Sequence, residues 1–165
     1  MAVIHLAVIP SPLGPLVAEA TDEALLRLTF IDQPPSVPRK EDHPVLQRVA
    51  TELEAYFAGT LTVFSVPVSP AGTGFEQTIW SLLSRIPYGT TLSYKELSVQ
   101  YGNLKAIRAV GKANGSNPIA ILIPCHRVIG ADGSLTGYAG GLERKRWLLD
   151  FEAKTFPGTQ LNLEL

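Results

Sequence analysis

The chain changes character at residues 69–74, and this break constrains the fold more than any other feature of the sequence. The segment reads Ser-Pro-Ala-Gly-Thr-Gly, a composition that favours a loop over helix or strand. Short apolar runs separated by turn residues precede it, whereas apolar residues recur at helical spacing after it. We therefore expect an α/β (α+β) chain with an N-terminal domain at residues 1–70, a mainly helical domain at residues 75–155 and a tail at 156–165.

The N-terminal domain is predicted to be a small antiparallel sheet with one helix. Residues 2–9, 16–20 and 25–30 are apolar runs with β-branched members, and the turn residues between them are few enough for a meander. Apolar residues at helical spacing predict a helix over residues 43–59. Residues 61–68 alternate and predict a further strand or extended segment.

The second half of the sequence predicts a helix-turn-helix. After a first helix over residues 75–86, Ser93 and Glu96 form a capping box that starts a helix over residues 94–100. A short turn that contains glycine then leads to another helix over residues 104–113.

The second helix of this pair has a basic face. Lys105, Arg108 and Lys112 share one side of it without an acidic residue on the same helix. An apolar edge runs along it, formed by Leu104, Ile107 and Val110. Residues 75–147 hold nine Lys and Arg against four Asp and Glu, whereas residues 1–74 hold four against eight. The basic face fits a nucleic-acid groove, but the solvated surface of an ordinary helix also explains it, so both interpretations stay open.

The chain has one cysteine, Cys125, and this count excludes several classes of protein. It rules out an internal disulfide framework and any zinc site built on several cysteines, and His5 and His43 alone cannot complete a closed zinc site. A lone thiol is typical of the reducing cytoplasm, which is the expected compartment. No run approaches the roughly 18 apolar residues of a membrane span, and the first residues do not read as a signal peptide.

Cys125 stands where an apolar run ends. Residues 119–123 predict a buried, strand-like segment, and His126 and Arg127 follow the cysteine directly. A neighbouring cation or histidine base makes the reactive thiolate easier to form. The pattern admits acyl transfer, thioester exchange or alkyl capture, whereas a lone cysteine is more often a small core residue.

The sequence around Cys125 resembles the active-site signature of a known family. The run Ile-Pro-Cys-His-Arg-Val-Ile at 123–129 is similar to that of the methylated-DNA–protein-cysteine methyltransferases, the O⁶-alkylguanine-DNA alkyltransferases. The resemblance covers residues 75 to 152 nearly without gaps. It includes Ile-Pro-Tyr-Gly at 86–89, Arg-Ala-Val-Gly at 108–111, Ala-Asn-Gly-Ser-Asn-Pro at 113–118 and Thr-Gly-Tyr-Ala-Gly-Gly at 136–141. The N-terminal half matches in outline.

This resemblance implies direct repair of alkylated DNA. Family members flip the damaged base out of the duplex and move the alkyl group irreversibly onto the cysteine, once per molecule. The implied substrate is chiefly O⁶-methylguanine in double-stranded DNA, with O⁴-alkylthymine as a further candidate. No cofactor, no metal and no obligate protein partner is expected, and a monomer is expected in solution.

The resemblance also implies roles for individual residues. Cys125 matches the nucleophile, His126 the base that takes the thiol proton through a water, and Glu152 the carboxylate that orients this histidine. Asn117 matches an asparagine that bonds the turn before the active-site segment. Arg127, although inside the signature, is expected to be a structural ion-pair partner.

Further positions match the family's DNA and base contacts. Arg108 matches an arginine that enters the duplex from the minor groove, Tyr94 a tyrosine beside the flipped base, and Lys145 a lysine that stabilises the departing guanine. The implied DNA contacts are Arg108, Lys105, Ala109, Lys112 and Tyr94. The implied base pocket consists of Tyr138, Ala139, Gly140, Gly141, Ile123 and Pro124.

Simpler interpretations of single residues, and two other classes of protein, stay open. Glu152 can be a surface carboxylate, and Lys145 can belong to a solvated charge run with its two arginine neighbours. A damage-recognition module would bind DNA without using its cysteine. A Cys-His acyl transferase would need oxyanion donors, which the sequence does not reveal.

Overall fold

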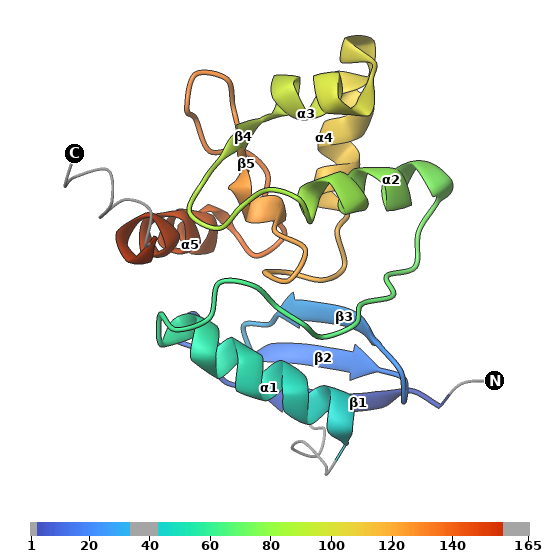
Figure 1. Cartoon of the computed structure of the whole chain (residues 1–165), viewed down its shortest axis with the longest axis vertical. Coiled ribbons are helices and arrows are strands. Elements are labelled where there is room, and N and C mark those ends of the chain that lie inside the picture. Colours follow the sequence, from blue (N-terminus) through green and yellow to red (C-terminus); the bar gives the residue numbers. More distant parts are fainter. Residues whose placement is uncertain (1–2, 34–42, 157–165) are drawn as a thin grey trace. The chain divides into compact units, whose positions relative to one another are not determined.

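The computed structural model describes residues 3–33 and 43–156, and its internal contacts divide the chain into two compact units (Figure 1). The first unit consists of Met1–Ala71 together with Pro118–Leu122. The second consists of Gly72–Asn117 and Ile123–Leu165. The short segment Pro118–Leu122 therefore belongs to the first unit although its neighbours in the sequence belong to the second.

The first unit is built on a three-stranded antiparallel sheet, as the sequence predicts. Strands β1 (His5–Ile9), β2 (Leu16–Ala20) and β3 (Leu25–Phe30) lie in the order β1-β2-β3. Alternate residues point into the core, so that Ala7 pairs with Ala18 and Ala18 with Leu28 on the buried face.

Helix α1 (Pro44–Phe57) packs against β1 and β2 of this sheet (Figure 1). Its buried face consists of Val45, Leu46, Val49, Leu53 and Tyr56. Pro44 occupies the first turn, where no amide donor is needed, and the ring of His43 caps the helix by accepting the Leu46 N–H over 3.3 Å. The described helix lies inside the predicted range 43–59.

His43 belongs to a small polar cluster with His5 and Asp22. The Nε2 atoms of the two histidines lie 3.2 and 3.3 Å from the same Asp22 oxygen. Because Nδ1 of His43 accepts the Leu46 N–H, its Nε2 carries the proton and donates to Asp22. In this arrangement the ring links a strand turn to the helix N-terminus, and Nε2 offers no free lone pair to a metal.

Neither of two segments, one predicted as a strand or extended segment and the other as strand-like, forms a regular strand. Residues 61–68 and 119–123 each contribute one isolated bridge to β3, between Val68 and Leu25 and between Ile119 and Leu28. Each bridge lies next to a proline, Pro67 or Pro118, whose carbonyl accepts from β3 but which has no N–H to extend a ladder. The two segments therefore pair with β3 only through single backbone bridges.

The second unit contains the expected helix-turn-helix. Helix α2 (Gly74–Leu83) is followed by α3 (Tyr94–Tyr101) and α4 (Ile107–Gly115). Ser93 and Glu96 make both bonds of the predicted capping box at the start of α3. The predicted helix at 104–113 begins instead as a 3-10 turn, η1 (Leu104–Ala106), because the Asn103 side chain caps at Lys105 N.

The apolar edge expected on the second helix is largely exposed. Val110 is fully buried, but Leu104 and Ile107 are 47% and 39% exposed. The helix is held instead through its other residues: Trp80 of α2 donates from Nε1 to the carbonyl of Ala113 over 2.8 Å. Of the three residues of the predicted apolar edge, only Val110 is therefore buried.

Four elements of this unit have no clear signal in the sequence. They are β4 (Leu92–Ser93), β5 (Val128–Ile129), the 3-10 turn η2 (Cys125–Arg127) and helix α5 (Leu142–Thr155). The parallel pair β4–β5 is only two residues long, and α5 begins with a charged run, so neither shows a strong apolar period.

Only Phe156 of the predicted tail lies among the described residues. No helix in the described ranges has the length and apolar content needed to cross a membrane.

Gly89 and Gly133 form a matched pair for testing how tightly the second unit is packed. Both have left-handed backbones, with φ of +78° and +86°, but a Cβ at Gly89 would lie 2.5 Å from the Phe156 ring, whereas one at Gly133 would meet nothing within 4 Å. We expect Gly133→Ala to lower the free energy of unfolding by about 1–2 kcal/mol through the backbone alone. Gly89→Ala should cost about 1–3 kcal/mol more because of the clash. Equal losses in denaturant titrations would contradict this packing.

Candidate active site

Cys125 is a buried thiol at the start of η2. It follows the buried residues Ile123 and Pro124 and is 7% exposed. Burial raises the pKa of the Cys125 thiol, and a hydrogen bond from Asn117 and the nearby Lys145 cation offset this only in part. At neutral pH the resting group is therefore a thiol, and it needs a base before it can act as a nucleophile.

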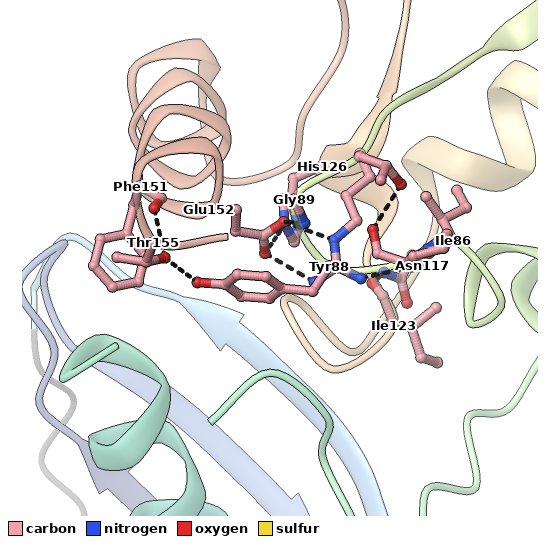
Figure 2. A network of polar contacts seen from close by, with 12 residues as sticks. Ile86, Tyr88, Gly89, Asn117, Ile123, His126, Phe151, Glu152 and Thr155 are labelled. Carbon is pink, nitrogen blue, oxygen red and sulfur yellow. Dashed lines mark hydrogen bonds and ion pairs between the residues drawn. The ribbon is translucent and has the colours of Figure 1, made fainter. Parts of the chain in front are cut away.

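His126, the next residue, is the candidate for that base. Its Nε2 lies 2.8 Å from Glu152 Oε2, and both side chains are buried (Figure 2). Because Nε2–H donates a hydrogen bond to the carboxylate, the lone pair of the neutral ring is on Nδ1. Nδ1 is buried and has no hydrogen-bond partner among the described residues. Burial lowers the pKa of His126 although Glu152 opposes this, so the ring is neutral and one nitrogen is available as a base.

Glu152 is fully buried on α5 and is held by two neighbours of the cysteine. Besides His126, Arg127 donates to both carboxylate oxygens, from Nε over 2.7 Å and from Nη2 over 2.9 Å. Burial alone would raise the pKa of Glu152, but the hydrogen bonds from His126 and Arg127 outweigh it and hold the pKa well below its usual range. The interpretation of Glu152 as a surface carboxylate is therefore wrong, and Arg127 makes the expected ion pair.

Asn117 connects the end of the helix-turn-helix to the active-site segment. It follows α4, and its Nδ2 donates to the carbonyl of Ile123 over 2.8 Å (Figure 2). The same side chain is hydrogen-bonded to the Cys125 thiol. Asn117 thus closes the base of the loop at 118–122 and contacts the thiol.

Lys145 and Tyr94 meet at one backbone carbonyl. Lys145 Nζ donates to Thr136 O over 2.9 Å, and Tyr94 OH donates to the same oxygen over 3.1 Å. Burial lowers the pKa of Lys145 while the Cys125 thiolate would raise it, which places this cation near the nucleophile. Lys145 is fully buried, so it is not part of a solvated charge run, whereas its neighbour Arg146 is exposed.

The loop before α5 holds the other residues that the resemblance assigns to a base pocket. Burial raises the pKa of Tyr138 well above its usual range, and a Cys125 thiolate would raise it further; its hydroxyl is buried without a partner among the described residues. Ala139 is exposed, the Gly140 carbonyl accepts from Arg144, and Gly141 N donates to Tyr138 O. The structure thus brings Tyr138 near the cysteine, while Ala139 faces outward.

The basic residues of the helix-turn-helix lie on its surface. Lys105, Arg108 and Lys112 are exposed, as is Ala109 between them. Lys112 lies near Glu76 of α2, an acidic neighbour that the helix sequence alone does not reveal. A hollow of about 420 Å³ opens beside this face, lined by Tyr94, Ile107, Arg108, Gly111, Thr136 and Gly137. Arg108 and Tyr94 therefore border the same hollow.

Sequence reasoning missed one part of the site. Tyr88 hydrogen-bonds through its hydroxyl to Thr155, Gly89 N donates to Glu152 over 3.4 Å, and the Ile86 carbonyl accepts from Arg127 over 2.8 Å (Figure 2). The only signal was the Ile-Pro-Tyr-Gly motif itself, to which no role was given. The whole arrangement offers a thiol, a neutral imidazole and a carboxylate bonded to that imidazole, groups that suit transfer of a group to sulfur.

The chain matches two family descriptions that together span most of its length. Residues 4–70 match the ribonuclease-like domain, and residues 74–154 the DNA-binding domain, of 6-O-methylguanine DNA methyltransferase. The methylated-DNA–protein-cysteine methyltransferase of Mycobacterium tuberculosis is 47% identical over 157 residues, which cover 93% of this chain and 95% of that protein. The enzyme of the same name from Methanosarcina acetivorans is 45% identical over 155 residues, covering 90% and 98%.

A solved structure has the same fold. The crystal structure of Mycobacterium tuberculosis OGT in complex with DNA superposes with a TM-score of 0.83 at 47% identity, covering 93% of this chain and 95% of that one. With both domains matched and relatives of this identity over nearly the full length, the chain belongs to the 6-O-methylguanine DNA methyltransferase family, whose members are named methylated-DNA–protein-cysteine methyltransferases.

Proposed function

We propose that this chain repairs O⁶-alkylguanine in DNA by moving the alkyl group from the guanine oxygen to Sγ of Cys125. The observation that carries the proposal is the buried thiol of Cys125 beside a neutral His126, whose Nδ1 has no hydrogen-bond partner within residues 3–33 and 43–156 and whose Nε2 is held by Glu152. The thioether formed has no route back to a thiol, so each molecule acts once.

The reaction starts with a proton transfer. Nδ1 of His126 takes the thiol proton through a water, and the thiolate attacks the alkyl carbon in line with the carbon–oxygen bond. The carbon–sulfur bond forms as the carbon–O⁶ bond breaks, and the electron pair of that bond leaves with the guanine. One proton returns to the guanine, so the thiol hydrogen has been exchanged for the alkyl group. Lys145, buried near the sulfur, stabilises the negative charge on the departing base.

The helix-turn-helix provides the DNA-binding face. Arg108 borders the hollow beside Tyr94, where its planar guanidinium can fill the gap left by a flipped base. Lys105 and Lys112 are exposed for phosphate contacts. The small side chain of Ala109 lets the helix approach closely. The exposed side chains of Leu104 and Ile107 suit the apolar sugar edges of a minor groove.

The flipped base would enter beside the loop before α5. Tyr138, Ala139, Gly140 and Gly141 from that loop, with Ile123 and Pro124 before the cysteine, form the proposed pocket. Support comes from the buried Tyr138 hydroxyl and its proximity to Cys125. O⁴-alkylthymine is a second proposed substrate of this pocket.

The remaining proposals concern the chain as a whole. Residues 75–155 would bind DNA and accept the alkyl group, while residues 1–70 would serve as a scaffold. Double-stranded alkylated DNA is the expected partner of a monomeric protein, with no cofactor. A reduced compartment such as the cytoplasm would keep the single thiol reactive.

Cys125→Ser decides whether the thiol accepts the alkyl group. The wild-type protein, mixed with an oligonucleotide that contains O⁶-methylguanine, should gain the mass of one methylene unit and stop there, with the change confined to the Cys125 peptide. The variant should bind the DNA and gain nothing, because a serine hydroxyl is far less acidic than a thiol. Intact-protein mass spectrometry checks both. Binding by the wild-type protein without any mass change would favour a damage-recognition module instead.

His126→Gln tests the base. Since burial keeps the resting thiol protonated, we expect single-turnover transfer at pH 7 to fall about a hundred- to ten-thousand-fold. The rate should then rise with pH, because more thiolate forms as the pH approaches the raised pKa of the thiol. His5→Gln, in the first unit, is the matched control and should keep the wild-type rate. A variant profile parallel to that of the wild type would reject His126 as the base.

Arg108→Ala tests docking to the duplex. We expect repair of duplex DNA to slow by about tenfold or more, corresponding to roughly 1–3 kcal/mol, while the reaction with a free modified base is unchanged. Arg85→Ala removes another exposed arginine of the second unit and should leave both rates unchanged. Equal slowing of the duplex and free-base reactions by Arg108→Ala would rule out insertion of this arginine into DNA.

A further inference from the structure

The Glu152 carboxylate is contacted by two parts of the second unit that take no chemical step in the proposed reaction. One is Arg127, which donates to both oxygens over 2.7 and 2.9 Å. The other is the loop at residues 86–89, whose Gly89 N lies 3.4 Å from Oε1 (Figure 2). Oε2 is therefore shared between Nε2 of His126 and Nη2 of Arg127.

We infer that Arg127, held by the loop at residues 86–89, is a positioning residue that keeps Nδ1 of His126 unprotonated until the thiol proton arrives. The inference rests on the proposed function, because it gives His126 the task of a base. It adds to the structural ion pair of Arg127 a second role, which is to control the protonation of His126.

The charges around the ring explain why an arginine is needed there. A buried Glu152 carboxylate alone would form a neutral ion pair with a protonated His126, and this would favour the imidazolium. An imidazolium has no lone pair on Nδ1 and cannot accept a proton. Arg127 already balances the carboxylate, so a second proton would leave an unbalanced positive charge among buried side chains.

Four further ionisable groups lie near His126 and Glu152. These groups are Lys145 on α5, Cys125 on η2, Tyr88 in the loop and Tyr138 before α5. Burial lowers the pKa of His126, Glu152 opposes this, and both Arg127 and Lys145 lower the pKa further. Helix α2 also packs against η2, and its buried residues are Ile79, Trp80 and Leu83, none of which titrates.

The loop at residues 86–89 fixes the guanidinium in one orientation. Nη1 of Arg127 donates to the Ile86 carbonyl over 2.8 Å, and the guanidinium lies over the Tyr88 ring, 5.6 Å from its centre. Tyr88 is in turn hydrogen-bonded to Thr155, three residues beyond Glu152 on the same helix. A planar fork with several donors can meet both carboxylate oxygens and this carbonyl at once, whereas a lysine ammonium cannot.

Three variants test the inference through the pH dependence of His126. The imidazole is titrated by NMR in the free protein, and the single-turnover rate is measured against pH with duplex DNA that contains O⁶-methylguanine. In Arg127→Gln we expect the midpoint of both titrations to rise by about one pH unit or more, so that the loss of rate is greatest at low pH and shrinks as pH rises. Arg127→Lys keeps the charge but not the fork, and should show a smaller rise. Arg146→Gln makes the same charge change at an exposed site on α5 and should keep the wild-type midpoint.

A uniform loss of rate would contradict the inference. If the rate of either Arg127 variant falls by the same factor at every pH and its NMR midpoint stays at the wild-type value, Arg127 is only structural and the inference is overturned. If Arg127→Gln does not fold, Arg127→Lys decides alone on the same criterion. The NMR titration needs no alkyl transfer, so failure of the wild-type protein to methylate Cys125 would reject the proposed function and leave the titration result to be judged separately.

Discussion

The second unit is organised around one buried carboxylate. An ionised Glu152 inside a protein is costly unless donors surround it, and it receives them from His126, Arg127 and the backbone of Gly89. These donors come from the turn that carries the nucleophile and from the loop after α2, while the carboxylate comes from α5. The carboxylate can be buried only when these three segments are correctly placed against one another. The hydrogen bonds that stabilise this part of the fold therefore also set the position of the His126 ring.

Burial keeps the site unreactive at rest. Burial raises the pKa of the Cys125 thiol and lowers that of His126, so both groups are uncharged at neutral pH. A protein that reacts once is lost to any stray electrophile that meets its thiolate. A protonated sulfur protects the single reactive group at rest. In the proposed reaction, Lys145 adds a positive charge where negative charge develops during transfer.

Much of the fold could be predicted from sequence signals that act between neighbouring residues. The apolar runs at residues 16–20 and 25–30 predicted two strands to the residue, and Ser93 with Glu96 predicted the start of α3, because these signals depend only on neighbours in the chain. The burial of single side chains could not be predicted in this way, because it depends on partners that are distant in the sequence. The sequence leaves open that Lys145 is a solvated charge between two arginines, yet its side chain is buried and Nζ donates a hydrogen bond to the Thr136 carbonyl. Leu104 and Ile107 share the apolar edge of their helix with Val110, yet only Val110 is buried. The residue-by-residue roles at the site came from resemblance, since no spacing rule joins Cys125 to a carboxylate on another helix.

The segment Pro118–Leu122 shows why the reactive turn cannot be understood from its own residues. Its Ala120 N–H and Pro118 carbonyl bond to Leu28 on β3, and Ile121 adopts a left-handed backbone with φ of 69°, which is costly for a β-branched residue. The excursion is closed at its base by the hydrogen bond from Asn117 to the carbonyl of Ile123. A chain free at either end would relax such a conformation, so the strained turn persists because both ends are fixed. Every side chain assigned to the site comes from the second unit, but the backbone that leads to Cys125 is held in part by pairing with a strand of the first.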